Sequence, residues 1–389
     1  MKITSLDQLS DEPTRLAAFP VAQKKIFLGH AGVTALPRCV ANAVIDYTNA
    51  SSENDQEFGD VLRRVGDTRR VCANMIGAKP NEIALLGPTS LGLSLFANGL
   101  PWEPGDEIIC YLDDYPANVY PWKNLERLGV RLVYLKPEHP GEITPQLVEQ
   151  ALTHKTKLVA LASCHFLTGY RIDINAIGQL AHDHGALFSL DAIQTIGAFP
   201  TTVEHVDFLS ADAHKWMLGP LATGIVMVKE KHFDLLRPTL LGAWNIQSPN
   251  FITQDSIEFE AGARRYEPGV LNCAGIFGMQ AALQMMQAVG LGNISNRLLE
   301  LKATIVAQLK ERGFTIHGKE TGPNASSITT FTHPAKDLEA LFNHLTEAGI
   351  TASFRHDRSG QPFLRFSPHF YNTEAELDRV FQAIDTLPE

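Results

Sequence analysis

The sequence predicts an α/β fold in which a large domain with a mostly parallel central sheet precedes a small α+β domain. Short apolar runs with the length and β-branched content of buried strands recur along the first 230 residues. Helical spacing between several of them gives the alternation typical of a parallel sheet. The 389 residues exceed one ordinary domain. We expect a large domain at 20–290 and a small domain at 291–389, with residues 1–19 as an arm associated with the small domain.

Composition excludes several classes of protein. A hydrophobic content of 44% and a charged content of 20% are those of a soluble globular chain. A net charge of -10 without Lys/Arg runs argues against a nucleic-acid partner. Five scattered cysteines without a C-x-x-C pair argue against a disulfide framework or a zinc site. No signal-like start and no apolar stretch of about 20 residues is found, so we expect no membrane span and a cytoplasmic protein.

The first 80 residues are predicted to form an arm, a short apolar run with a turn, and a helical stretch. Residues 1–19 are polar, and KKIFLGHAGVTALP is an apolar run that ends in a Gly-rich turn. Between Cys39 and Ile76 the pattern is helical and polar-rich. The charges at positions 63–70 of that stretch are expected on a solvated face.

A strand at Asn81–Gly87 is followed by a helix that starts near Thr89 and Ser90. The free backbone N–H groups and the positive dipole end of a helix start bind phosphate, and hydroxyl groups add donors. The same residue types often serve only as caps.

Further strands are expected at Glu107–Leu112, 130–137 and 157–166, with a helix at Pro145–Thr153 capped by Thr144. A helix at Ile174–Gly185 leads to the central stretch of the chain. The small domain is expected to contain strands at Ala325–Thr332, Ile350–Phe354 and Phe363–Phe366, and helices at Lys336–Ala348 and Glu374–Leu387.

The central stretch places a carboxylate and a lysine just beyond two predicted strands. Asp191 ends the run Leu187–Leu190, and Lys215 follows the run Val206–Leu209; a third run spans Gly224–Val228. Ligands bind at the carboxyl ends of strands in open α/β sheets, so the two side chains can face one ligand. Pyridoxal phosphate needs this pair, because a lysine holds its aldehyde as a Schiff base and a carboxylate keeps its ring nitrogen protonated. Taken singly, Lys215 would be a surface lysine and Asp191 a helix cap.

The surrounding residues resemble the class V aminotransferase family of pyridoxal-phosphate enzymes, which have the aspartate-aminotransferase fold, fold type I. Asp191 and Gln194 are similar to its D-x-x-Q, and residues 214–220 are similar to its H-K-W-x-x-G-P. The group includes cysteine desulfurases, selenocysteine lyases and isopenicillin-N epimerase-like proteins. The resemblance implies pyridoxal 5′-phosphate as cofactor, Lys215 and Asp191 as catalytic residues, Gln194 as a cofactor ligand, and His214 as their companion at the phosphate or above the ring.

The resemblance also implies further cofactor contacts. Thr89 and Ser90 match the phosphate-binding turn, and Tyr115 takes the place of a ring stacked on the pyridine. His165 stands where relatives bond the phenolic oxygen of the cofactor, although a buried structural histidine is the alternative. Asp212 occupies the place of a Ser or Thr phosphate ligand, so we expect its carboxylate to face elsewhere, toward His214 or a backbone cap.

Substrate contacts are implied at both ends of the chain. His30 and Ala31 match a segment that lines the substrate side of the cofactor, with a turn histidine bonded to backbone as the alternative for His30. Arg365 lies in an R-x-S-x-x-x-Y-N-T setting similar to the one that binds the substrate carboxylate. Arg355 and Arg358 could bind a second acidic group or be solvated.

Residues 265–272 resemble a segment that crosses the dimer interface and touches the phosphate in the partner subunit. Val270 replaces the usual Thr there, so only a backbone donor remains. The resemblance therefore implies a homodimer whose active site is built between two chains.

The implied reaction begins with Cα deprotonation of a small α-amino acid. Transamination, β-elimination of the kind a C–S lyase performs and epimerisation can each follow, and we favour one of the first two. A cysteine desulfurase or selenocysteine lyase is the alternative. The desulfurases keep a nucleophilic cysteine shortly before the carboxylate-binding arginine, and TASFRHDRSGQPF contains none. A catalytically silent protein that only holds the cofactor is a further possibility.

Overall fold

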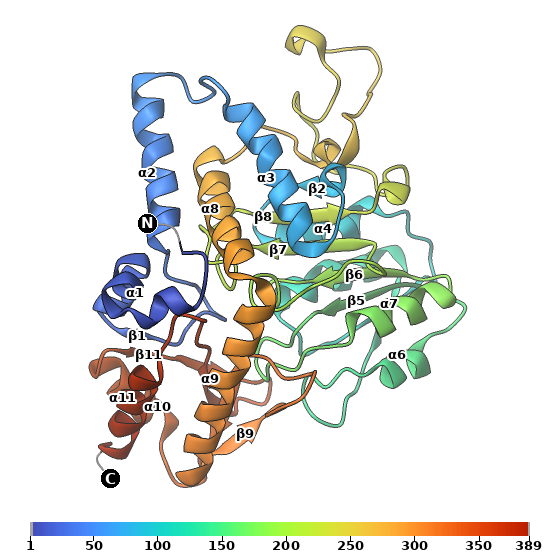
Figure 1. The fold of residues 1–389 in the computed structure, drawn as a ribbon. Coiled ribbons are helices and arrows are strands. Elements are labelled where there is room, and N and C mark those ends of the chain that lie inside the picture. The colour runs from blue at the N-terminus through green and yellow to red at the C-terminus, as the bar shows by residue number, and fades with distance from the viewer. Residues whose placement is uncertain (1–2, 388–389) are drawn as a thin grey trace.

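The computed structural model describes residues 3–387, which are organised around a seven-stranded mixed sheet (Figure 1). The strand order is β2-β8-β7-β6-β5-β3-β4. The strands from β7 to β4 are parallel, whereas β8 is antiparallel to both β7 and β2. This confirms the predicted α/β class and the mostly parallel sheet. The strands are Ile83–Ala84 (β2), Glu107–Cys110 (β3), Arg131–Tyr134 (β4), Thr156–Ala162 (β5), Leu187–Asp191 (β6), Phe208–Asp212 (β7) and Gly224–Val228 (β8).

Helices cover both faces of this sheet because successive strand residues point to opposite faces and most of them are apolar. Ile108 packs into a core that includes Phe96 of α4, while Ile109 belongs to a second core that includes Phe277 of α8. The helices of the large domain are Arg38–Glu53 (α2), Val61–Ile76 (α3), Thr89–Gly99 (α4), Tyr120–Lys123 (α5), Pro145–Ala151 (α6), Ile174–Asp183 (α7) and Cys273–Val289 (α8).

Helix α4 lies directly against β7, which fixes the position of its first turn. A Cβ atom at Gly92 would lie 2.4 Å from Ser210 Oγ, so only glycine permits this approach. The Ser210 hydroxyl donates to the Thr89 carbonyl at 2.9 Å, and the Asp212 N–H donates to Thr89 Oγ1 at 2.8 Å. The start of α4 is therefore tied to the carboxyl end of β7.

The small domain contains a four-stranded antiparallel sheet of order β12-β13-β10-β9, packed against three helices. Its core includes Ile305, Phe331, Leu341 and Phe366. Gly290 separates α8 from α9, at the boundary predicted between residues 290 and 291. The elements are Thr315–His317 (β9), Thr329–Thr332 (β10), Ser353–His356 (β12), Pro362–Phe366 (β13), Leu291–Glu311 (α9), Leu338–Glu347 (α10) and Glu374–Asp385 (α11).

The N-terminal part of the chain also packs on the small domain. Strand β1 (Ile26–Phe27) pairs in parallel with β11 (Ile350–Thr351), and both Ile26 and Leu28 lie in the core of the small domain. Residues 26–28 thus join that core, although the predicted large domain begins at residue 20. The isolated bridge between Gly29 and Ser367 continues the contact toward the end of β13.

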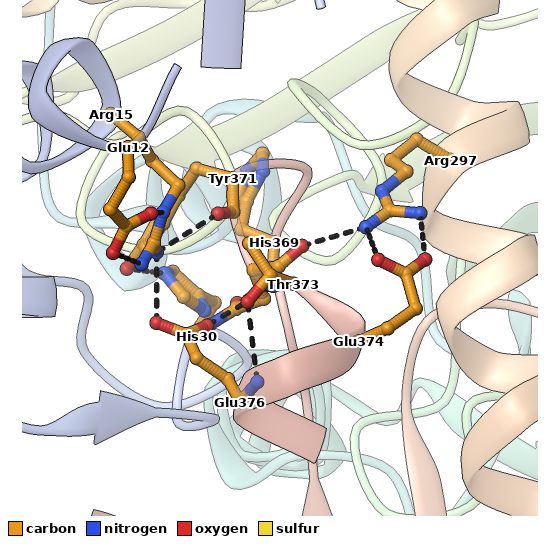
Figure 2. A network of polar contacts seen from close by, with 10 residues as sticks. Glu12, Arg15, His30, Arg297, His369, Tyr371, Thr373, Glu374 and Glu376 are labelled. Carbon is orange, nitrogen blue, oxygen red and sulfur yellow. Dashed lines mark hydrogen bonds and ion pairs between the residues drawn. The ribbon is translucent and has the colours of Figure 1, made fainter. Parts of the chain in front are cut away.

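Residues 3–19 of the predicted N-terminal arm are folded, and five of their side chains, those of Ile3, Leu9, Arg15, Ala18 and Phe19, are buried. The arm forms helix α1 (Glu12–Ala18), which begins after Asp11, whose carboxylate accepts the Thr14 N–H. Figure 1 shows α1 near α11, and Figure 2 shows the ion pair between Arg15 of α1 and Glu376 of α11, which are 2.8 Å apart.

Several predicted strands have different boundaries in the structure. The strand predicted at 157–166 ends at Ala162, the one predicted at Ala325–Thr332 begins at Thr329, and Ile350–Phe354 is divided between β11 and β12, which lie in different sheets. Only Ile83–Ala84 of Asn81–Gly87 is extended, because residues 80–82 form a 3-10 turn. The strand predicted at Val206–Leu209 begins at Phe208 and continues to Asp212, since Val206 closes a turn by donating to Val203. Strand β9 was not predicted.

The solvated face predicted on residues 63–70 is only half correct. Arg63 and Arg70 are exposed. The Arg64 guanidinium lies 4.0 Å from the centroid of the Phe277 ring, and Arg69 pairs with the buried Glu267. Helix α8 packs against α3 on that side, so two of the four arginines are drawn into an interface. Across residues 3–387, the helices lack the combined length and apolar character needed to cross a bilayer.

Candidate active site

A cavity of about 340 Å³ lies where the carboxyl ends of β6 and β7 meet the start of α4 and one face of the small-domain sheet. Residues from both domains line it, together with the turn that follows β1. The side chains and backbone at its wall belong to Ala31, Gly32, Val33, Pro88, Thr89, Ser90, Tyr115, Ala117, Phe166, Asp191, Ile193, Gln194, His214, Lys215, Arg355 and Arg365. Nine of the twelve site residues predicted from the sequence therefore surround one space.

Asp191 is the last residue of β6 and is only 3% exposed. Its Oδ1 accepts the backbone N–H of Ile193 at 3.1 Å. Burial raises the pKa of the Asp191 carboxyl to about 6, against the opposing effects of the Ile193 N–H and the positive charge of Lys215. Because these two contacts do not offset the cost of burying the Asp191 carboxylate, a cationic group placed against it would be favoured.

Lys215 follows β7 and is 6% exposed. Burial lowers the pKa of its ammonium group to about 8, although Asp191 acts in the opposite direction. Its Nζ lies 5.2 Å from the centroid of the Tyr115 ring. A desolvated lysine with a lowered pKa supplies free amine near neutral pH, as a nucleophile or a base requires.

Asp114 is a buried carboxyl beside this pair that the sequence reasoning missed. It accepts the Tyr115 N–H at 2.7 Å and the Asn118 amide at 3.0 Å. Burial and the nearby charge of Asp191 raise the pKa of the Asp114 carboxyl to about 7. The signal that identified Asp191, a polar residue just beyond a buried strand, also points to Asp114 beyond β3.

The start of α4 presents the donors expected for a phosphate. Thr89 and Ser90 lie in its first turn, where backbone N–H groups have no partners within the helix. Because Thr89 Oγ1 already accepts the Asp212 N–H, its own hydroxyl proton is available to a ligand in the cavity.

Asp212 turns toward His214, as predicted from the charge of a phosphate. Asp212 Oδ1 accepts the backbone N–H of His214 at 3.2 Å and lies 2.8 Å from Nδ1 of its ring. The ring contact is close but lacks hydrogen-bond geometry. Asp212 Oδ2 is buried without a partner in the described residues, so this carboxylate is held at the edge of the site by one oxygen.

Gln194 and Ala31 form one wall of the cavity. The Gln194 amide donates to the Ala31 carbonyl at 3.2 Å and accepts the Trp216 indole N–H at 2.8 Å. Trp216 follows Lys215, so this amide connects the lysine turn to the turn after β1. Because these two hydrogen bonds fix the orientation of the Gln194 amide, its second amide proton is available to a ligand.

Arg365 of β13 forms the deepest basic part of the cavity, with 1% exposure. Its terminal nitrogens contact the Phe166 carbonyl and Ser353 Oγ, while Nε has no partner in the described chain. Burial, followed by the charge of Arg355, lowers the pKa of the Arg365 guanidinium to about 9. No carboxylate of residues 3–387 pairs with it, so the site is suited to an anionic ligand.

The structure corrects two predicted contacts, those of His30 and His165. His30 is fully buried outside the cavity, and its ring nitrogens contact the Ser367 carbonyl at 2.9 Å and the Tyr371 hydroxyl at 3.0 Å. His165 contacts Thr168 Oγ1 and the Asp113 carbonyl. Both ring nitrogens of each histidine are therefore satisfied by the protein, which agrees with the structural roles weighed as alternatives.

Val270 is also outside the cavity. Its side chain is 74% exposed, in the segment between β8 and α8. A contact with a cofactor would therefore need a second chain, as the resemblance implies.

None of the five free cysteines lines the cavity. No group of three His, Cys, Asp or Glu residues in the described part of the chain is arranged to hold a metal ion.

The donor set fits pyridoxal 5′-phosphate. Asp191 offers a buried carboxylate for a protonated ring nitrogen, and Lys215 offers an amine for an aldehyde. The first turn of α4 offers donors for a phosphate, with Tyr115 as a flat ring near the lysine. Only the buried Asp212 departs from what a phosphate would favour, and its carboxylate faces His214.

Comparison with known proteins gives consistent findings. A model of the aminotransferase class-V family matches residues 26–380. The chain is similar to a "Probable cysteine desulfurase" of Methanothermobacter thermautotrophicus, with 26% identity over 95% of this chain and 96% of that protein. An apo cysteine desulfurase structure from Thermococcus onnurineus has a TM-score of 0.89 at 23% identity, covering 97% of this chain and 98% of that one. The cystine C–S lyase C-DES, bound to its product cysteine persulfide, has a TM-score of 0.85 at 19% identity, covering 95% and 100%. The similarity to these two solved structures shows the fold of this chain.

Proposed function

This chain belongs to the aminotransferase class-V family, and we propose that it is a pyridoxal-phosphate-dependent enzyme that acts on a small α-amino acid. The reaction is transamination or β-elimination of a side-chain substituent. One observation carries this proposal: Lys215, Asp191 and Arg365 converge on one cavity from two strands of the large sheet and one of the small sheet.

Each of these residues has a distinct task. When bound, pyridoxal 5′-phosphate supplies an aldehyde that captures an amine and a ring that disperses the electrons left at Cα. Arg365 binds the α-carboxylate of the substrate through its guanidinium and thereby orients Cα. The amine of Lys215, once free, takes the Cα proton at Nζ. Asp191 keeps a proton on the ring nitrogen through its buried carboxylate.

A cysteine desulfurase or selenocysteine lyase is the second candidate, favoured by the relative from Methanothermobacter thermautotrophicus. A desulfurase that carries sulfur on its own thiol needs a cysteine at the substrate, and no cysteine lines this cavity. The C–S bond cleavage of a lyase needs no such thiol. A catalytically silent scaffold that only holds the cofactor is disfavoured, because such a protein does not need a desolvated lysine beside a carboxyl group.

Spectroscopy and product analysis of the cofactor-loaded protein test the proposal. We expect at least one amino acid from a panel of L- and D-forms to shift the visible absorption band. A keto acid whose amino group stays on the cofactor indicates transamination, whereas a keto acid with ammonia and a released sulfide or other leaving group indicates elimination. Inverted configuration without a keto acid would indicate epimerisation and contradict both reactions. No spectral change with any amino acid would favour the scaffold.

We also propose that the active enzyme is a homodimer with its site at the interface. The segment between β8 and α8 projects at the top of Figure 1 and exposes several apolar side chains. These are Leu240, Leu241, Phe251, Ile252, Ile257 and Val270. Sedimentation at micromolar concentration should give twice the 42.8 kDa chain mass. Phe251→Glu should weaken the dimer, while Tyr120→Glu, at another exposed ring, should not. A monomer that retains full activity would overturn this proposal.

A further inference from the structure

Two arginines lie on the same face of the small-domain sheet. Strands β12 and β13 are antiparallel, and Ser353 stands opposite Arg365. Arg355 is two residues beyond Ser353, so its side chain leaves the same face and is a diagonal neighbour of Arg365. Both side chains line the cavity, Arg365 as a buried residue and Arg355 as an exposed one.

Gly32 lies at the cavity wall beside both guanidinium groups. A Cβ atom built on Gly32 would lie 3.6 Å from a terminal nitrogen of Arg355 and 3.9 Å from a terminal nitrogen of Arg365. Both donors are therefore within 4 Å of one point at the cavity wall. A small ligand held there can reach both arginines.

The charges around this point are unbalanced. The ionisable side chains that line the cavity are basic except for Asp191 and Tyr115, and the basic ones are His214, Lys215, Arg355 and Arg365. Arg355 forms no ion pair with any residue of 3–387. Its charge lowers the pKa of both Arg365 and Lys215. A second anion bound beside Arg355 would relieve this repulsion.

Arg358 lies in the same loop as Arg355, but it is exposed and forms an ion pair. Its Nε lies 3.0 Å from Asp113 Oδ1, and its side chain lines a neighbouring cavity. The two arginines that the sequence left equivalent are thus distinguished by the fold, because only Arg355 enters the catalytic cavity.

We propose that Arg355 binds a second anionic group, so that the preferred substrate is an acidic α-amino acid. Arg365 takes the α-carboxylate at the bottom of the cavity, and Arg355 takes the side-chain carboxylate, or a sulfinate of similar size, near its mouth. The inference rests on the proposed function and adds the substrate class to it. Charge-assisted hydrogen bonds to guanidinium are the strongest polar contacts available for such discrimination.

Kinetics on matched substrate pairs test the substrate class. With the holoenzyme, kcat/KM for L-aspartate should exceed that for L-asparagine, or that for L-glutamate should exceed that for L-glutamine, by at least about tenfold. Arg355→Gln should lower this acidic-to-neutral ratio by about 10- to 100-fold, mainly through KM for the acidic partner. Arg358→Gln removes an arginine from the same loop and should leave the ratio unchanged.

A binding measurement makes the test independent of turnover. Calorimetry on the holoenzyme should show succinate binding at least about tenfold more tightly than butyrate, and Arg355→Gln should abolish the difference. Turnover of neutral amino acids without an acidic preference would overturn the proposal, as would a preference that survives Arg355→Gln. If no amino acid reacts but succinate still binds in an Arg355-dependent manner, the anion site stands and the proposed function fails. If neither is observed, both fail.

Discussion

Replacing Lys215 by alanine should lower turnover of every substrate by at least about 10²- to 10⁴-fold, the usual contribution of a positioned proton-transfer group. The variant should also lose the covalent link to the cofactor, because Lys215 is the one lysine of residues 3–387 that lines the cavity. Borohydride reduction of cofactor-loaded wild-type protein should fix a pyridoxyl group on the peptide that contains Lys215, as measured by mass spectrometry. The alanine variant should show no such adduct.

Lys302 provides an internal control for that experiment. Burial lowers the pKa of Lys302 to about 8, as for Lys215, but its ammonium donates to the Ile328 carbonyl, and neither residue lines the cavity. A lowered pKa alone therefore predicts labelling of both lysines, whereas the geometry predicts labelling of Lys215 only. An adduct on Lys302, or activity of Lys215→Ala within tenfold of the wild type, would refute the assignment.

Replacing Arg15 by methionine should lower the free energy of unfolding by about 3–5 kcal/mol, which is typical for removing one partner of a buried ion pair. The side chains of Arg15 and Glu376 are only 4% and 7% exposed, and they join the N-terminal arm to α11 (Figure 2). Without Arg15, the Glu376 carboxylate keeps only the donors from Asn372 and the Thr373 backbone. Urea unfolding of the two proteins measures the difference.

Figure 2 also contains the control for this prediction. Arg297 pairs with Glu374, but that carboxylate is 63% exposed. Arg297→Met should therefore cost no more than about 1 kcal/mol. In a double-mutant cycle, Glu376→Gln should reduce the cost of Arg15→Met, because no buried charge is then left unpaired. If the Arg15 and Arg297 variants lose the same free energy of unfolding, burial of the Arg15–Glu376 pair adds nothing to stability.

The buried network of Arg15 also explains why His30 is structural. Asn372 donates to Glu376 and its Oδ1 accepts the His369 N–H, while the His369 ring contacts the Trp216 carbonyl at 3.0 Å. His30 packs against His369 and Trp216 in the same region. The arm, the end of β13 and the turn after Lys215 are thus joined behind the active site, where a histidine supports the site without reaching a ligand.

The sequence by itself determined the class of sheet, the positions of most strands and the residues at their carboxyl ends. Strand length, residue type and alternation are local properties, and the carboxyl ends of parallel strands meet at one edge whatever the rest of the chain does. For this reason the pattern alone predicts that Asp191 and Lys215 face one ligand, whereas Thr89 and Ser90 at the start of α4 join them through the resemblance to the family. Thr144 as a helix cap depends on an equally local signal, and its side chain accepts the Leu147 N–H.

Only the tertiary structure decided which polar side chains face the cavity and which face the protein. His165 and Arg358 both meet residues of the segment after β3, and His30 meets residues 367 and 371, more than 300 positions away. Such partners are set by the packing of segments that are distant in sequence, both within the large domain and between the two domains, which no local pattern encodes. The same packing turned Arg64 and Arg69 inward and left Arg355 without a carboxylate, because a charge is satisfied by whichever group the fold brings within about 4 Å of it.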